Sequence, residues 1–390
     1  MTFDLILIGF GNVARRFVAL LAEQRTALAR HHGLTTRVVG IATRRHGQAY
    51  DAAGLPTYVV SGSKAREEIA PDVVRTFRSA RHGRPEGLHY SDFSRDAHGG
   101  HDIRSATLDF LGEALTRSRA AARQRRLVVI ETTTLDIARG EPATSHIRAA
   151  LTGGAHVVTA NKGPVAFAYR TLARAAARAD RRFLFEGAVM DGVPVFNLVR
   201  ETLPAVNVIG FRGVVNSTTN FILTAMEQGQ PFAAALAEMQ ERGIAEADAS
   251  LDVDGWDAAA KTAALANVLL GASITPHAVD RQGIAPHAGP RAIEARAAGR
   301  RLKLVARARR EGRHVMAQVK PEELPADDLL AGLEGQQNAI ILETDLLEEI
   351  AVVQRSGSLT QTAYALLSDL ITIARARPQS PPSARGRRSL

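Results

Sequence analysis

Runs of hydrophobic residues and their spacing predict alternating strands and helices in the first part of the chain. A short apolar run at residues 4–8 is followed by an amphipathic stretch, in which Val13, Phe17 and Leu20 recur at helical spacing as far as about Arg30. Further strands are predicted at residues 37–42, 127–130 and 156–159. Because strands that alternate with helices are typical of a parallel sheet, we expect an α/β fold with a first domain at residues 1–163. A charged, mainly helical insertion at about 71–126 interrupts the pattern.

The pattern changes beyond Pro164, where helices and strands are mixed. Helices are predicted near 164–179, 192–203, 217–228, 231–242 and 254–270, and strands near 182–186, 207–214, 302–309, 313–320 and 337–343. This mixture predicts an α+β second domain at residues 164–345. Residues 346–375 are expected to supply a strand and a helix, near 359–375, that return to the first domain. Residues 376–390 are arginine- and proline-rich without acids, which is typical of a disordered basic tail.

The turn after the first strand has the pattern G-x-G-x-x-A. Its first glycine permits a tight turn, and its second lets the backbone approach a pyrophosphate at the N-terminus of the following helix. Because a strand precedes the pattern and a helix follows it, we expect a Rossmann-type dinucleotide site. The residues assigned to the cofactor there are Gly9, Phe10, Gly11, Asn12 and Val13.

Two arginines follow the second strand and bear on the choice of cofactor. A site specific for NAD usually ends this strand with Asp or Glu for the ribose hydroxyls, but here the chain reads Thr43-Arg44-Arg45. Guanidinium groups bind a 2′-phosphate well, which favours NADP(H) over NAD(H). The alternative is that Arg44 and Arg45 are ordinary members of an arginine-rich surface. At the carboxyl edge of a later strand, Thr133 is a further candidate for contact with the cofactor.

Composition excludes several classes of function. The chain has no cysteine, so it has neither a thiol nucleophile nor a disulfide framework. The net charge of +9 is partly carried by the tail, and aromatic residues make up only 5% of the chain, so nucleic-acid binding is not expected. No apolar run approaches the roughly 20 residues of a membrane span, and the first strand leaves no room for a signal peptide. We therefore expect a cytoplasmic protein without a membrane partner.

Lysine is rare in this chain, with five among 49 basic residues. Where a positive charge alone is needed the sequence has arginine, so a retained lysine indicates a role that guanidinium cannot fill, above all giving up a proton. Lys162 follows the strand at 156–159, and Lys261 ends the acidic stretch GIAEADASLDVDGWDAAAK. A plain ion pair between Lys261 and Asp257, four residues earlier on one helix face, explains the residue equally well.

Ten segments, in chain order, resemble the homoserine dehydrogenase family. They are GFGNVA, HVVTANKGPVA, EGAVMDGVPV, GVVNSTTNFIL, ERGIAEADASLDVDGWDAAAK, DRQGI, RLKLVA, VKPEELP, NAI and TQTAYALLSDL. The most specific are TANKGP and the acidic segment that ends at Lys261. The resemblance covers nearly the whole chain apart from the insertion and the tail. It implies NAD(P)H-dependent, reversible reduction of L-aspartate 4-semialdehyde to L-homoserine by a homodimer, whose second domain binds the substrate and carries the dimer contacts.

The resemblance also implies residue roles. Lys261 matches the acid/base lysine, and Lys162 matches a lysine between cofactor and substrate that steadies the developing alkoxide. Glu246 and Asp257 match carboxylates that bind the substrate ammonium, and Asp252 matches a further acidic position. Gly243 and Gly357 match cofactor-binding glycines. A monovalent cation, Na⁺ or K⁺, is implied at Glu186, Val189, Asp191 and Val193, although Met190-Asp191 replaces the small residues usual in that turn.

Other interpretations remain open. The chain is also compatible with an enzyme of the same architecture that acts on another small amino-acid aldehyde or ketone, or with a non-catalytic NADP(H)-binding sensor. Asp254 is interpreted as the N-cap of the helix through Trp256, without a chemical role. The tail is too short for a regulatory ACT domain, so feedback inhibition through such a domain is not expected.

Overall fold

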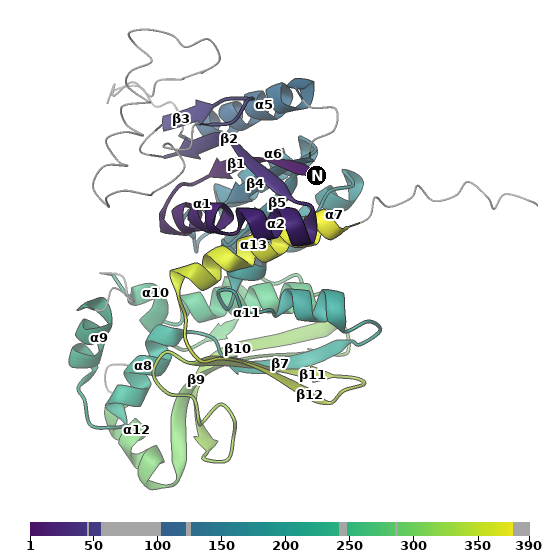
Figure 1. Cartoon of the computed structure of the whole chain (residues 1–390). Coiled ribbons are helices and arrows are strands. Elements are labelled where there is room, and N and C mark those ends of the chain that lie inside the picture. Colours follow the sequence, from purple (N-terminus) through teal and green to yellow (C-terminus); the bar gives the residue numbers. More distant parts are fainter. Residues whose placement is uncertain (45–46, 56–102, 122–125, 242–247, 285–287, 377–390) are drawn as a thin grey trace, which may run out of the picture.

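The computed structural model describes residues 1–44, 47–55, 103–121, 126–241, 248–284 and 288–376. They form two six-stranded sheets that lie one above the other in Figure 1, with helices packed on both. The strand order is β3-β2-β1-β4-β5-β6 in the first sheet, sheet A, and β12-β11-β7-β9-β10-β8 in the second, sheet B. Sheet A carries the predicted nucleotide site, in agreement with the expected α/β fold.

Sheet A is parallel except at one edge. Its parallel strands are β1 (Thr2–Ile8), β2 (Thr35–Thr43), β4 (Arg126–Glu131), β5 (His156–Thr159) and β6 (Phe183–Leu184), and its antiparallel edge strand is β3 (Gly47–Tyr50). The register aligns Ile8 with Ala42 on β2 and with Glu131 on β4. The carboxyl ends of these strands therefore meet at a single edge, where ligands of doubly wound sheets bind.

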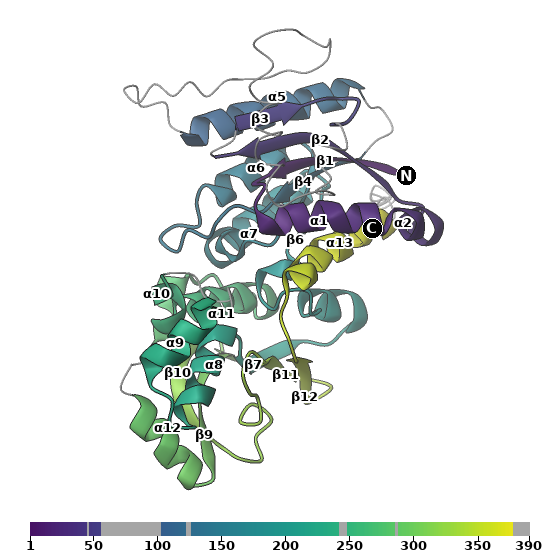
Figure 2. The same ribbon diagram turned by 60° about the vertical axis from the view of Figure 1, so that its left-hand side comes forward.

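Alternate residues of β1 enter two different cores, because side chains point to opposite faces of a sheet. Phe3, Leu5 and Leu7 pack in one cluster, and Ile6 and Ile8 in the other. The first cluster lies under α1 (Asn12–Glu23), α2 (Arg25–His32) and α13 (Leu359–Arg375), and the second under α5 (Ile103–Ala121), α6 (Ala143–Thr152) and α7 (Lys162–Arg178). The C-terminal helix α13 thus lies beside α1, although the two are far apart in sequence (Figure 2).

Sheet B is mainly antiparallel and carries helices on one face. Its strands are β7 (Val208–Val214), β8 (Asp280–Arg281), β9 (Arg300–Glu311), β10 (His314–Pro325), β11 (Asn338–Thr344) and β12 (Glu349–Gln354). The accompanying helices are α8 (Ser217–Met226), α9 (Phe232–Glu241), α10 (Ser250–Val253), α11 (Trp256–Leu269) and α12 (Ala288–Ala297). Helix α11 contacts β9 and β10 on one side and α7 on the other, so it joins the two layers and brings α7 to the acidic segment.

Three local expectations need correction. The helix expected at 192–203 begins only at Phe196, because the chain before it is a turn containing Pro194, and it continues as a π-helical segment at Leu198–Thr202. The helix expected to run to Arg30 is divided at Gln24 into α1 and α2. Asp254 is not the N-cap of α11: that position is Gly255, whose φ of 79° is left-handed, and Asp254 is the C-cap of α10. A left-handed residue turns the chain sharply between the two helices, which a glycine does without steric cost.

Candidate active site

The turn after β1 is closely packed and ends at an open helix terminus. Gly9 has a φ of 86°, and a Cβ there would lie 2.8 Å from the carbonyl oxygen of Thr132. Gly11 is the N-cap of α1, has no side-chain cap, and would have nothing within 4 Å of a Cβ. No side chain therefore caps the first amide groups of α1, and the space beside Gly11 is open, which is an arrangement that suits phosphate binding. The residues fit the dinucleotide predicted from the sequence.

A buried carboxylate organises the neighbouring strand ends. Glu131, at the end of β4, accepts hydrogen bonds from the Thr133 amide at 2.8 Å and the Thr159 hydroxyl at 2.7 Å. Burial raises the pKa of Glu131. Asn161 donates to the carbonyl oxygen of Thr133 at 3.1 Å and accepts from the Gly163 amide at 2.9 Å. Asn161 is thus the N-cap of α7 and fixes the first turn of that helix, where Lys162 lies.

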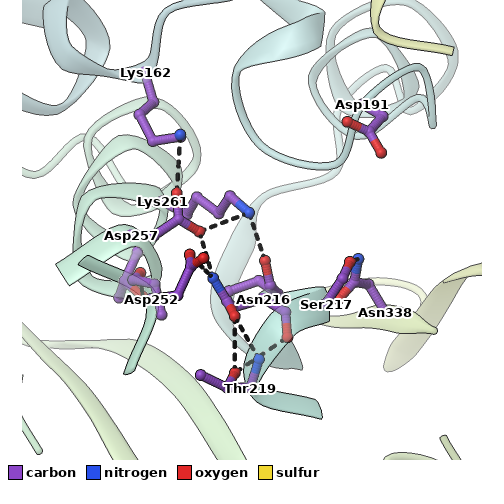
Figure 3. Close-up of polar contacts among 12 residues, drawn as sticks. Lys162, Asp191, Asn216, Ser217, Thr219, Asp252, Asp257, Lys261 and Asn338 are labelled. Atoms are coloured by element: carbon purple, nitrogen blue, oxygen red, sulfur yellow. Dashed lines mark hydrogen bonds and ion pairs between the residues drawn. The ribbon is translucent and has the colours of Figure 1, made fainter. Parts of the chain in front are cut away.

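Two lysines share one carboxylate (Figure 3). The Lys162 ammonium lies 2.9 Å from Oδ1 of Asp257, and the Lys261 ammonium lies 2.9 Å from Oδ2. Lys261 also donates to the carbonyl oxygen of Val215 at 2.7 Å. The side chains of Lys162, Asp257 and Lys261 are 21, 13 and 15% exposed, so the cluster is mostly shielded but still open to a small molecule.

Asn216 ties the acidic segment to α8. Its side-chain oxygen accepts from the Thr219 amide at 2.8 Å, which makes it the N-cap of α8. Its side-chain nitrogen donates to Asp252 at 2.7 Å and to Asp257 at 2.9 Å (Figure 3). Sequence reasoning assigned no role to Asn161, Asn216 or Glu131. An asparagine directly after a strand and before a helix is an N-cap signal that could have identified the first two.

The charges in this cluster oppose the effect of burial. Burial by itself would raise the pKa of Asp257, but the ammonium groups of Lys162 and Lys261 hold it well below its ordinary range. Burial by itself would lower the pKa of Lys261, but the Asp257 carboxylate reverses this and raises it. The pKa of Asp252 is raised by burial and by the negative charge of Asp257. The cluster therefore contains an ionised aspartate beside a protonated lysine that has a proton to donate.

The four residues predicted to hold a cation lie between β6 and the π-helix. The Glu186 carboxylate accepts the amide hydrogens of Val195 (2.6 Å), Phe196 (2.9 Å) and Asn197 (2.6 Å). Asp191, at a left-handed φ of 49°, accepts from Gln354 at 2.9 Å and from Thr362 at 3.0 Å. Both carboxylates are thus engaged by donors of the chain. Within the described part of the chain no group of three or more His, Cys, Asp or Glu is arranged to hold a metal ion.

The remaining predicted residues divide into two groups. Arg44 is exposed directly after β2, and Gly357 lies in the turn between β12 and α13, where a Cβ would be 2.8 Å from Oδ2 of Asp191. Arg45, Gly243 and Glu246 lie outside the described residues.

Among the residues that the structure covers, no helix is long and apolar enough to cross a membrane.

Comparison with known proteins identifies the family. The family model described as homoserine dehydrogenase matches residues 194–371. The chain is 34% identical over 372 residues to an NAD(+)-dependent homoserine dehydrogenase of Pseudomonas canavaninivorans, covering 95% of this chain and 96% of the relative. A solved structure of a putative homoserine dehydrogenase from Archaeoglobus fulgidus aligns with a TM-score of 0.72 at 27% identity, over 95% of this chain and 99% of the other. A hyperthermophilic archaeal homoserine dehydrogenase in complex with NADPH aligns with a TM-score of 0.70 at 26% identity, over 96% and 98%. The chain belongs to the homoserine dehydrogenase family.

Proposed function

We propose that the chain catalyses the reversible reduction of L-aspartate 4-semialdehyde to L-homoserine with a nicotinamide cofactor, as a step of amino-acid biosynthesis in the cytoplasm. The observation that carries the proposal is the pair of ammonium groups, on Lys162 and Lys261, held by the single carboxylate of Asp257. Reduction of a carbonyl needs a proton donor and a positive charge near the oxygen, whereas a nucleotide-binding sensor needs neither. The family of the chain supports the choice of substrate.

We assign the proton transfer to Lys261. An ammonium group has three N–H donors, and the contacts to Val215 and Asp257 use two of them. The third is left for a substrate oxygen. In the reducing direction Nζ donates a proton to the aldehyde oxygen, and in the oxidising direction the neutral amine takes the hydroxyl proton. When bound, the nicotinamide supplies or accepts the hydride.

The other charged residues bind and orient the substrate. Lys162 places a second positive charge beside the carbonyl oxygen, where it stabilises negative charge that develops during reduction. Asp257 and Asp252 receive the substrate ammonium group. Burial and, after it, the negative charge of Asp257 raise the pKa of Asp252, and an arriving cation relieves the repulsion between the two carboxylates. Glu246 is assigned to the same ammonium group from the family resemblance.

We further propose that NADP(H) is preferred over NAD(H). Arg44 lies exposed at the carboxyl end of β2, beside the turn expected to hold the cofactor, where its guanidinium would pair with a 2′-phosphate. Arg45 follows it in sequence. The relatives described above do not decide between the two cofactors, since one is named as NAD(+)-dependent and another was solved with NADPH. The proposed preference for NADP(H) therefore rests on the two arginines. The remaining cofactor contacts are assigned to Gly9, Phe10, Gly11, Asn12, Val13, Thr133, Lys162, Gly243 and Gly357.

The cation is proposed on narrower grounds. Oxygen donors suit Na⁺ or K⁺, but the Glu186 carboxylate already accepts three amide hydrogens and Asp191 accepts two side-chain donors. The ion would therefore be held by main-chain carbonyl oxygens, including those of Val189 and Val193. Activity measured in tetramethylammonium buffer, with and without added KCl or NaCl, tests this. Equal activity in all three buffers would remove the cation from the mechanism.

We also propose that the chain acts as a homodimer built on its second domain, at residues 164–345. Exposed apolar side chains near edge strand β12 support this: Leu346 is 65% exposed, Leu347 48% and Val353 44%. Residues 1–163 and helix α13 would form the nucleotide-binding part, whereas β12, which the sequence placed in the returning segment 346–375, pairs with β11 in sheet B and so extends the second domain. Light scattering of the purified protein gives the number of chains, and a monomer at micromolar concentration would contradict the proposal.

The test of the reaction is L-homoserine-dependent reduction of NADP⁺ and of NAD⁺, followed by nicotinamide absorbance, in the wild type and in Lys261→Met. We expect turnover in the wild type and its loss in the variant, with the cofactor still bound. Binding of NADP(H) without turnover of L-homoserine or L-aspartate 4-semialdehyde would contradict the proposal. Activity on another small amino-acid aldehyde would then identify a related dehydrogenase. Absence of activity on every such aldehyde would favour the non-catalytic NADP(H)-binding sensor.

A further inference from the structure

A cavity of about 1230 Å³ lies at the edge of sheet A opposite the cofactor turn. Its wall includes Arg126, His156 and Phe183, which are the first residues of β4, β5 and β6. The residues assigned to the cofactor and to catalysis follow the other ends of the same strands. A six-residue strand such as β4 spans roughly 20 Å, so the cavity is separate from the proposed active site.

Five arginines line the cavity without a carboxylate partner in the described part of the chain. They are Arg119, Arg126, Arg181, Arg182 and Arg310. Two of them also donate to main-chain oxygens, Arg126 to Ile373 at 3.0 Å and Arg181 to Gly154 at 2.5 Å, which leaves further N–H groups of each guanidinium for a ligand. Other arginines of this chain form ion pairs with carboxylates, for example Arg212 with Asp328 at 2.7 Å and Arg307 with Glu322 at 2.7 Å.

The remaining lining residues add little negative charge. The acids in the wall are Asp180 and Asp4, and Asp4 is paired with Arg37 at 2.8 Å. A sixth arginine, Arg200, is paired with Glu201 at 2.7 Å. The excess of positive charge also affects His156. Burial, together with the charges of Arg181, Arg126 and Arg182, lowers the pKa of its imidazole to about 4. The imidazole is therefore neutral near pH 7, which limits the repulsion, but the guanidinium groups stay charged at any accessible pH.

The five arginines come from both layers of the molecule. Arg119 on α5, Arg126 on β4 and the Arg181-Arg182 pair before β6 belong to the sheet A side, whereas Arg310 is on β9 of sheet B. Apolar side chains such as Phe183, Val199 and Leu270 complete the wall. A bound anion would bring opposite charge between like-charged groups of the two layers and so hold the layers together.

We propose that this cavity binds a small molecule that carries two or more phosphate groups. A guanidinium group presents a planar set of donors that matches phosphate oxygens two at a time, and several arginines around one space suit several such groups. The volume exceeds that of most small-ligand pockets, which leaves room for an organic body against the apolar wall. The ligand would be a stabilising or regulatory one, because none of the described residues assigned to catalysis lines the cavity.

Inorganic triphosphate is the probe for this site. Titration calorimetry at low ionic strength, with NADP⁺ saturating the cofactor turn, is compared between the wild type and the double variant Arg181→Gln/Arg182→Gln. The matched control is Arg174→Gln/Arg178→Gln, which removes two exposed arginines from α7. We expect one saturable site per chain in the wild type, at least about tenfold weaker binding in the double variant, and less than about twofold change in the control.

A second variant separates binding from folding. Arg310→Gln removes the charge from the sheet B side and should also weaken triphosphate binding while L-homoserine oxidation stays near that of the wild type. Triphosphate should raise the Tm of the wild type by a few degrees and that of the double variant by less. Failure of the wild type to bind triphosphate saturably, or equal weakening in the control and the double variant, would overturn the proposal without touching the assigned reaction.

Discussion

The Nζ atom of Lys261 lies 2.9 Å from Oδ2 of Asp257, one helical turn before it on α11. On an exposed helix such a pair contributes only roughly 0.2–0.5 kcal/mol. Here both side chains are largely buried and a second lysine shares the carboxylate, so the pair does more than support the helix. Because Asp257 raises the pKa of Lys261, the Lys261 ammonium stays protonated and can donate a proton to the aldehyde oxygen in the reducing direction.

Lys261→Arg tests whether the proton or only the charge matters. Arginine keeps the positive charge and can still pair with Asp257, but it does not release a proton at accessible pH. We expect kcat to fall by about 10²–10⁴-fold, the usual contribution of a positioned acid or base, with little change in the KM for the cofactor. Near-native turnover in steady-state assays would exclude Lys261 as the proton donor.

Asp257→Asn should shift the pH profile of L-homoserine oxidation. In that direction Lys261 must be neutral to accept the hydroxyl proton, so kcat in the wild type should rise with pH until the raised pKa of Lys261 is reached. Asparagine removes the charge that raises this pKa most, so the effect of burial, which lowers it, is opposed only by the weaker influence of Asp191 and Asp252. The rise of kcat should therefore occur at lower pH in the variant, with a lower maximum because the substrate site is damaged. An unmoved inflection would mean that another group limits the profile.

Arg44→Ala tests the choice of cofactor. Loss of a charge-assisted contact to a 2′-phosphate should raise the KM for NADPH by roughly tenfold and leave the KM for NADH nearly unchanged. Arg30→Ala, at an exposed position of α2, is the matched control for the loss of one arginine. If Arg44→Ala acts equally on both cofactors, or if the control behaves like it, the preference for NADP(H) has no basis in this residue.

The sequence allowed sheet A and its ligand edge to be predicted, because both depend on local signals. The run before Gly9 and the turn itself identify β1 and the start of α1, and Lys162 follows a recognisable strand. The pair of Lys261 with Asp257 was predicted from their four-residue spacing and is confirmed. The approach of Lys162 to the same carboxylate was not predictable from spacing, since it depends on how α7 packs against α11. In addition, α6 and α12 were not identified.

The local rules failed where a distant contact decides the structure. The helix expected from residue 192 begins only near Phe196, where the buried carboxylate of Glu186 accepts the first amide hydrogens of the helix. Asp254 was expected to cap α11, but the tight connection at Gly255 places it in the preceding turn. The partners of Asp191, namely Gln354 and Thr362, come from a segment more than 160 residues away, which no pattern along the chain reveals.

Gly357→Ala tests the contact between the turn after β12 and Asp191. The added Cβ would lie 2.8 Å from Oδ2 of a carboxylate that two hydrogen bonds hold in place. We expect the free energy of unfolding to fall by about 1–3 kcal/mol, as for other overpacked sites. Asp191→Ala loses the two hydrogen bonds but removes the obstacle, so adding Gly357→Ala to it should cost much less. Urea unfolding of the four proteins gives this coupling, and additive effects would show that the two residues do not interact.

Asp369 should make the stability of the fold depend on pH. This residue of α13 is fully buried and accepts from the Glu186 amide at 2.8 Å and from Asn197 at 3.2 Å. Burial raises the pKa of Asp369 to about 7 from an ordinary value of 3.8, and the negative charge of the Glu186 carboxylate adds to this rise. The hydrogen bonds from the Glu186 amide and from Asn197, and the positive charge of Arg200, act in the opposite direction. The folded state therefore favours the protonated form. Its stabilising effect is complete below about pH 4, decreases as the pH rises, and is lost above about pH 7.

Between these limits the ionisation of Asp369 alone lowers the free energy of unfolding by on the order of 4 kcal/mol, at about 1.4 kcal/mol for each unit of pKa difference between the folded and unfolded states. Other buried groups titrate as well, so the informative quantity is the difference between the wild type and Asp369→Asn, which cannot ionise at this position. We expect the variant to gain stability relative to the wild type as the pH is raised from 5 to 8 in urea unfolding experiments. Asp180→Asn, at an exposed position, serves as the control for the loss of one carboxylate. Parallel stability curves for wild type and Asp369→Asn would show that Asp369 has the same pKa folded and unfolded.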